Sequence, residues 1–240
     1  MELLFNALAF STAVLQVATV VFLFLGTIRK YAFVLAYCLL QLATSVVEMT
    51  VAIKFGHRSR QFFELFWTDE IVLDVLLFFI LILLTYRAME GSTAQGHVRR
   101  LLGGVMLMVM LVPFVLFKGA FITMAWFDHT SQLLNFGGAI LNLGLWTALL
   151  GSRKRDPQLL TVSAGFGVVV TGVAISFGCR RLSHLPGAGS HNLALMAADL
   201  VFVLAHLTGA LTLCWAFRPA KLSRNRTVGN LPSLSQNPTH

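Results

Sequence analysis

Acidic side chains inside apolar segments are the residues of this sequence best placed to do chemistry. Glu48, Glu70, Asp74 and Asp199 each interrupt or border a long hydrophobic run. A charge at the centre of a membrane helix costs roughly 2.5–3.5 kcal/mol, so such carboxyls are expected to be paired, protonated or in contact with water. Glu70 and Asp74 are helical i, i+4 neighbours, and their repulsion favours one protonated carboxyl unless a cation intervenes. These residues mark a candidate site for a proton or a ligand.

Further polar residues accompany them in the hydrophobic segments. Lys118 is the intramembrane cation, and His206 shares a helical face with Asp199. One face of the segment before Glu48 carries a polar stripe: Tyr37, Gln41, Thr44, Ser45 and Glu48. We therefore expect a water-accessible cavity lined by Glu48, Glu70, Asp74, Lys118, Asp199 and His206.

The composition shows what kind of element must position these residues. Of the 240 residues, 57% are hydrophobic and only 12% are charged, whereas soluble domains are about 25% charged. A membrane helix needs about 20 mostly apolar residues. The qualifying stretches predict an all-α, polytopic bundle of seven transmembrane helices at 3–26, 31–55, 62–87, 101–124, 130–151, 158–179 and 192–216.

The basic residues predict the orientation of this bundle. The net charge is +8, and Lys and Arg concentrate in alternate short connections and in the tail. Since cytoplasmic loops are enriched in these residues, the N-terminus is expected outside and the C-terminus in the cytoplasm. Residues 1–217 then form the membrane domain, and 218–240 a disordered basic cytoplasmic tail. The surplus of positive charge is a topology signal, and no nucleic-acid partner is expected.

This orientation places the intramembrane charges in one layer near the outer face. Several of them also have a simpler explanation. Asp69 and Glu70 could lie at headgroup depth, and Lys118 could snorkel to the surface or form a structural ion pair. His206 could be an ordinary core histidine. For Glu48, Asp74 and Asp199, a functional cavity and a structural ion-pair network remain equal alternatives.

Small residues and Pro113 suggest where helices approach closely or bend. Gly165 and Gly172 give the sixth segment a small-residue face, which is typical of close helix packing. The glycine pairs at 103–104 and 137–138 are expected to act similarly. Pro113 should kink the fourth helix.

Enzymatic activity is not expected. The sequence has no GxSxG, HExxH, P-loop or CxxC signature. No connection between the apolar segments is long enough to fold as a catalytic domain. No cofactor or metal site is predicted, and the cysteines are expected to be packing residues.

One stretch resembles a known group of proteins. Between Tyr31 and Glu90 an aromatic pair and a tryptophan followed by acids precede a long apolar run, in the order Tyr31-Ala32-Phe33, Tyr37, Phe62-Phe63 and Phe66-Trp67-Thr68-Asp69-Glu70. This is similar to uncharacterised bacterial seven-helix integral membrane proteins and to the seven-helix sensor regions of some histidine kinases. The resemblance covers about a quarter of the chain and implies a role for Glu70. It also implies a bacterial inner-membrane location.

Three functions follow as hypotheses. The first is a stand-alone, receptor-like sensor whose charged cavity opens to the outer face, with a separate signalling partner on the cytoplasmic side. The second is a small transporter or proton-coupled carrier that uses Glu48, Asp74 and Asp199, although no internal repeat supports it. The third is a structural membrane protein with buried ion pairs. Beyond the lipid bilayer and such a partner, no other partner is predicted.

Overall fold

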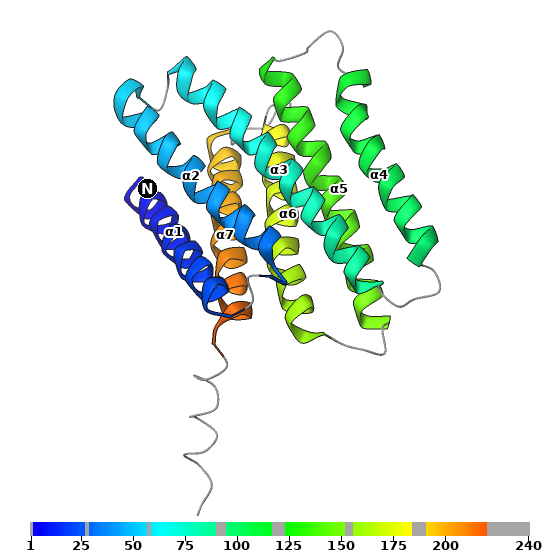
Figure 1. The fold of residues 1–240 in the computed structure, drawn as a ribbon. Helices are drawn as coiled ribbons and strands as arrows, with labels where there is room; N and C mark the ends of the chain where they lie inside the picture. The colour runs from blue at the N-terminus through cyan, green and yellow to red at the C-terminus, as the bar shows by residue number, and fades with distance from the viewer. Residues whose placement is uncertain are drawn as a thin grey trace, which may run out of the picture.

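The computed structural model describes residues 2–26, 29–56, 59–89, 95–116, 123–151, 156–183 and 191–219. These residues form helices and no strand (Figure 1). The helices are α1 (Glu2–Leu25), α2 (Ala32–Phe55), α3 (Arg60–Ala88), α4 (Gln95–Leu116), α5 (Met124–Gly151), α6 (Pro157–Ser183) and α7 (His191–Phe217). The predicted all-α architecture is confirmed, while most of the predicted tail lies outside the described residues.

Several helices are long and apolar enough to cross a bilayer. Within the part of the chain described, five meet that standard by length and composition: α1, α2, α3, α6 and α7. Their outward surface is apolar, with Phe10, Ile53 and Met49 more than 60% exposed. A soluble protein rarely leaves so many large apolar side chains uncovered, because water contact disfavours them. The protein is therefore a multi-pass membrane protein.

Side-chain caps set several helix starts, which differ from the predicted ones. The Ser59 hydroxyl accepts a hydrogen bond from the Phe62 N–H at 3.1 Å, so α3 begins at Arg60 instead of residue 62. Thr123 accepts from the Trp126 N–H at 3.3 Å, so α5 begins at Met124 instead of residue 130. The predicted limits followed hydropathy, whereas a helix starts where its first free N–H groups find an acceptor.

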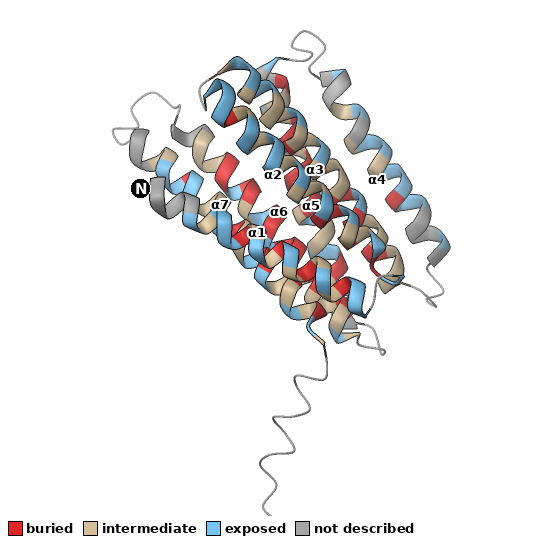
Figure 2. Cartoon of the chain, turned by 60° about the vertical axis from the view of Figure 1, so that its left-hand side comes forward, coloured by how far each residue is buried: buried red, intermediate tan, exposed pale blue. Residues whose placement is uncertain are grey.

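The helices pack in a bundle with α4 at one edge. α6 and α7 form the most extensive pair, α3 packs on α5, and α1 packs on α7 and α2. α4 touches α5 and α3 and stands apart from the rest (Figure 1). Buried residues lie along the facing sides of the helices (Figure 2), and the core is centred on Leu81, Leu84, Phe166, Val170 and Val173.

Glycines allow α6 and α7 to approach closely, as the sequence predicted. A Cβ on Gly172 would lie 2.2 Å from the Ala205 Cβ, and one on Gly165 would lie 3.0 Å from Leu213 Cγ. The pair at 137–138 also packs closely, since a Cβ on Gly138 would lie 3.2 Å from Val170 Cγ1. The prediction for Gly103 and Gly104 is wrong. Nothing among the described atoms lies within 4 Å of a Cβ at either position, because that face of α4 points away from the bundle.

Candidate functional site

Two carboxyls of α3 point into the bundle one helical turn apart. Glu70 and Asp74 are only 9% and 7% exposed. Asp74 Oδ2 accepts a short hydrogen bond from the hydroxyl of Ser131 on α5. Asn135, one turn along α5, donates from Nδ2 to the Ser131 carbonyl at 2.9 Å and lies within hydrogen-bonding reach of Asp74. Neutral donors from α5 therefore hold the Asp74 carboxyl.

A second pair of carboxyls joins α2 to α3. Glu48, from the polar stripe of α2, lies within hydrogen-bonding reach of Asp69 on α3, and Thr44 lies beside Asp69. Asp69 Oδ1 is buried and has no hydrogen-bond partner among the described residues. Two carboxyls within hydrogen-bonding reach of each other are stable together when they share a proton, because two negative charges would repel.

These residues form one electrostatic group, here called the acidic cluster: Glu48, Asp69, Glu70 and Asp74. Glu70 feels the charges of the other three carboxyls, and of Arg180 on α6. The ion pairs of the described residues lie elsewhere and join Lys30 to Asp156, Arg60 to Glu64 and Arg180 to Asp199. The described part of the chain also holds no group of three or more metal-ligating side chains close enough to bind a metal ion.

Asp199 lies apart from the acidic cluster. Its Oδ1 pairs with Arg180 Nη2 at 2.8 Å, and its side chain is 51% exposed. Depth along the helices predicts that Asp199 lies with Glu48 and Asp74, but depth does not fix the direction in which a helix presents a residue. The nearby cation is Arg180, which hydropathy assigned to a loop and which the structure places inside α6.

His206 also points elsewhere. Its Nδ1 lies 3.0 Å from the Phe202 carbonyl oxygen, and its ring lies 4.4 Å from the Phe202 ring. Because a carbonyl oxygen only accepts, this contact assigns the proton of a neutral His206 to Nδ1. His206 lines a small cavity between α1, α2, α6 and α7. Lys118, the predicted intramembrane cation, lies outside the described residues.

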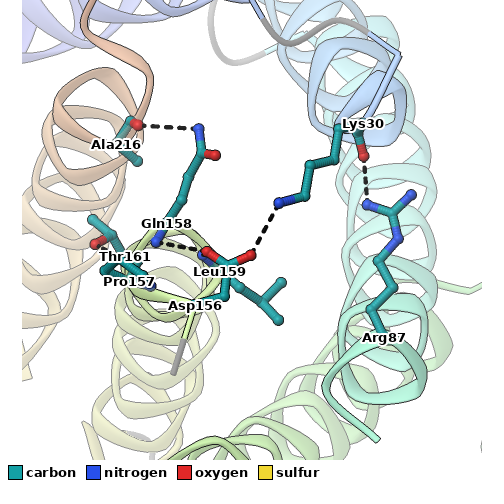
Figure 3. A network of polar contacts seen from close by, with 8 residues as sticks. All are labelled: Lys30, Arg87, Asp156, Pro157, Gln158, Leu159, Thr161 and Ala216. Atoms are coloured by element: carbon teal, nitrogen blue, oxygen red, sulfur yellow. Dashed lines mark hydrogen bonds and ion pairs between the residues drawn. The ribbon is translucent and has the colours of Figure 1, made fainter. Parts of the chain in front are cut away.

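The opposite end of α3 enters a different polar network (Figure 3). Arg87 of α3 donates a short hydrogen bond to the Lys30 carbonyl, and Lys30 Nζ lies 2.9 Å from Asp156 Oδ2. Tyr31, which is fully buried, packs its ring edge-on against Phe217 with centroids 5.1 Å apart. This network connects α2, α3, α6 and α7 at one end of the bundle.

The electrostatics of this network follow from the Lys30–Asp156 pair. The hydrogen bond to Asp156 raises the pKa of Lys30 above 10.5. Burial opposes ionisation of Asp156, but the hydrogen bonds from Lys30 and from the backbone N–H groups of Leu159 and Gln158 together lower its pKa below 3.8. Both groups are therefore charged across the neutral range.

The sequence singled out three of the four residues of the acidic cluster for the site, and it missed Ser131, the hydrogen-bond donor to Asp74. Ser131 is fully buried, but a lone serine in an apolar helix is usually a packing residue and gave no signal. From the sequence, Asp69 fits headgroup depth as well as it fits the site. The signal that links it to Glu48 is the antiparallel pairing of α2 and α3, which brings residues near their connection together.

The comparisons with known proteins add no assignment. No protein-family description, no curated protein and no solved structure matches this chain.

Proposed function

We propose that this protein is a seven-helix membrane sensor, with its N-terminus outside, that responds to protons reaching the acidic cluster from the outer face. The observation that carries the proposal is the burial of Glu70 and Asp74 without an ion-pair partner among the described residues. Membrane-buried acids without a direct ion pair are functional candidates, since charging them is costly and neutralising them requires only a proton.

Helix lengths and loop charges support the topology. α4 and α5 contain 22 and 28 residues, which is enough to cross a hydrocarbon core of about 30 Å. With the N-terminus outside, the acidic cluster lies in the outer half of the membrane. The Lys30–Asp156–Arg87 network then lies at the cytoplasmic end, where the positive-inside rule favours Lys and Arg.

α3 supplies the connection between the two ends. It carries Asp69, Glu70 and Asp74 between its first third and its midpoint, and Arg87 in its last turn. Protonation of the acidic cluster removes repulsion between α2 and α3, and a small shift of α3 would move Arg87 against Lys30. That movement would alter the cytoplasmic surface presented to a separate signalling partner.

A vesicle experiment tests this proposal. The full chain in lipid vesicles is exposed to acidic or neutral external pH, and hydrogen–deuterium exchange is measured in peptides containing Lys30 and Asp156. Glu70→Gln and Asp74→Asn should give the acid-state pattern at both pH values, because each mimics a protonated carboxyl. Glu64→Gln is the matched control on α3, because Glu64 is exposed and pairs with Arg60. It should keep the wild-type response.

The other functions appear as distinct results. The sensor proposal would be overturned if, in the wild-type protein, the peptides containing Lys30 and Asp156 showed the same hydrogen-exchange protection at both pH values. Net proton uptake into the vesicles that Asp74→Asn abolishes would show a carrier instead. Loss of folding in both Glu70→Gln and Asp74→Asn, with Glu64→Gln folded, would show that the carboxyls are structural.

A further inference from the structure

A further polar region lies beside Tyr37, where α1 and α7 meet α2 and α6. A cavity of about 10 Å³ is found there. Its polar lining residues are Gln16, Thr19, Tyr37, Cys38, Gln41 and His206. This volume is near the lower limit for one water molecule, and it is too small for a larger ligand.

The lining side chains include polar groups that need a partner. Gln16 is only 5% exposed, and the structure gives its amide no hydrogen bond to a described residue. His206 donates from Nδ1 to Phe202, which leaves the Nε2 of its neutral ring as an acceptor. A buried amide without a hydrogen bond costs about 1–3 kcal/mol, so a water that bonds both groups would be firmly held.

Tyr37 connects this cavity with the acidic cluster. It is 4% exposed, it lines the cavity, and its hydroxyl is within electrostatic range of Glu70 and Asp74. The polar stripe of α2 thus continues from Glu48 at one end to the cavity at the other.

We propose that the cavity is a binding site for a single water molecule, which bridges Gln16 of α1 to His206 of α7 and extends the polar path from the acidic cluster through Tyr37. The site does not depend on the proposed sensing function. It gives α1 a specific polar attachment to the bundle.

Radiolytic labelling of the full chain in H₂¹⁸O tests the site, because hydroxyl radicals formed from a bound water label the side chains next to it. Tyr37 and His206 should take up ¹⁸O several-fold more than Phe166. Phe166 is the matched control, since it is fully buried and its ring lies 5.3 Å from the Tyr37 ring. Labelling of Tyr37 and His206 no higher than that of Phe166 would overturn the proposal.

A substitution in the cavity wall gives an independent measurement. Ala210 lines the cavity and is 4% exposed. Ala210→Val should displace the water, lower the labelling of Tyr37 and His206 to the Phe166 level and lower the melting temperature, because Gln16 loses its partner. A higher melting temperature would contradict the proposal, since filling a dry cavity stabilises a protein. Should this variant not fold, the wild-type labelling decides alone.

Discussion

Asp74 shows how neutral donors can replace a cation at a buried acid. Its carboxyl lies between Ser131 and Asn135, both at most 1% exposed, and no lysine, arginine or histidine among the described residues pairs with it. Hydroxyl and amide donors can bond a carboxyl in either protonation state, because a hydroxyl also accepts. The arrangement can therefore take up or release a proton without moving a side chain across the bundle.

The Ser131–Asp74 contact can be measured by a double-mutant cycle. Ser131→Ala should lower the free energy of unfolding by about 1–3 kcal/mol, since it leaves the buried Asp74 carboxyl short of a donor. The same change in an Asp74→Ala background should cost much less. Thermal unfolding of the four proteins in detergent gives the coupling energy. Equal costs in both backgrounds would mean that the hydrogen bond contributes nothing.

Asp156 has two separable functions at the start of α6. Its Oδ1 accepts from the N–H groups of Gln158 and Leu159 at 3.0 and 3.2 Å, while Oδ2 pairs with Lys30. Asp156→Asn keeps the cap and removes the ion pair, whose exposed position limits its contribution to about 0–1 kcal/mol. Asp156→Ala removes both the cap and the ion pair, and it should lower the free energy of unfolding by about 1 kcal/mol more than Asp156→Asn does. Melting temperatures of the two variants check the order, and a less stable Asn variant would contradict it.

The pair also predicts a pH dependence. The pKa of Asp156 is lowered, so its contribution is present above its ordinary value of 3.8 and is lost as pH falls through the folded-state pKa. The pKa of Lys30 is raised, so its contribution is present below 10.5 and is lost as pH rises through the folded-state pKa. The difference in melting temperature between wild type and Asp156→Asn should therefore be constant near neutrality and shrink in strong acid. A difference that grows in acid would contradict this sign.

At the scale of the element, α3 and the α6–α7 pair have different roles. α3 has 29 residues, about 43 Å of helix, which exceeds the hydrocarbon thickness, so its ends extend into the headgroup regions or the helix tilts. α6 and α7 pack against each other through small residues and form a closely packed helix pair. The sequence predicted all three helices because long apolar runs and spaced glycines are local signals. It could not predict that Arg180 of α6 pairs with Asp199 of α7 while remaining within electrostatic range of Glu70 on α3, because that depends on how three helices meet.

Two glycines of α6 provide a matched test of the close packing between α6 and α7. Gly172→Ala should destabilise the protein by about 1–3 kcal/mol, because its Cβ would overlap the Ala205 Cβ at 2.2 Å, and backbones must separate to relieve it. Gly178→Ala should be neutral or slightly stabilising, since nothing lies within 4 Å of its Cβ among the described atoms. Thermal unfolding compares the two. Equal melting temperatures would mean that α6 and α7 are not in close contact.

At the scale of the whole molecule, the acidic cluster, the small cavity beside Tyr37 and the Lys30–Asp156–Arg87 network are separate polar regions of the bundle. Composition and hydropathy were sufficient to predict a helical membrane protein, since both depend only on what each segment contains. Membership of the acidic cluster was predicted only in part. Depth grouped Glu48, Glu70 and Asp74 correctly with one another, but it also included Asp199, whose partner Arg180 lies on the adjacent helix.

The proposed topology can be checked by labelling from one side of the membrane. Ser59→Cys, before α3, should react with a membrane-impermeant thiol reagent added outside intact cells. Met89→Cys, after α3, should react only after the cells are opened. The wild-type protein, with its own free thiols at Cys38, Cys179 and Cys214, gives the background. The reverse pattern would place the acidic cluster on the cytoplasmic side and contradict an external proton sensor.

The contact between α1 and α7 has a consequence for biosynthesis. α1 is synthesised before α2–α7 and packs mainly on α7, so α1 must wait in the bilayer until α7 has been inserted. During that interval Gln16 and Thr19 face lipid or a chaperone instead of the residues that bury them in the finished protein. A chain truncated before α7 would keep these polar groups exposed in the membrane, where quality-control proteases can recognise an orphaned helix.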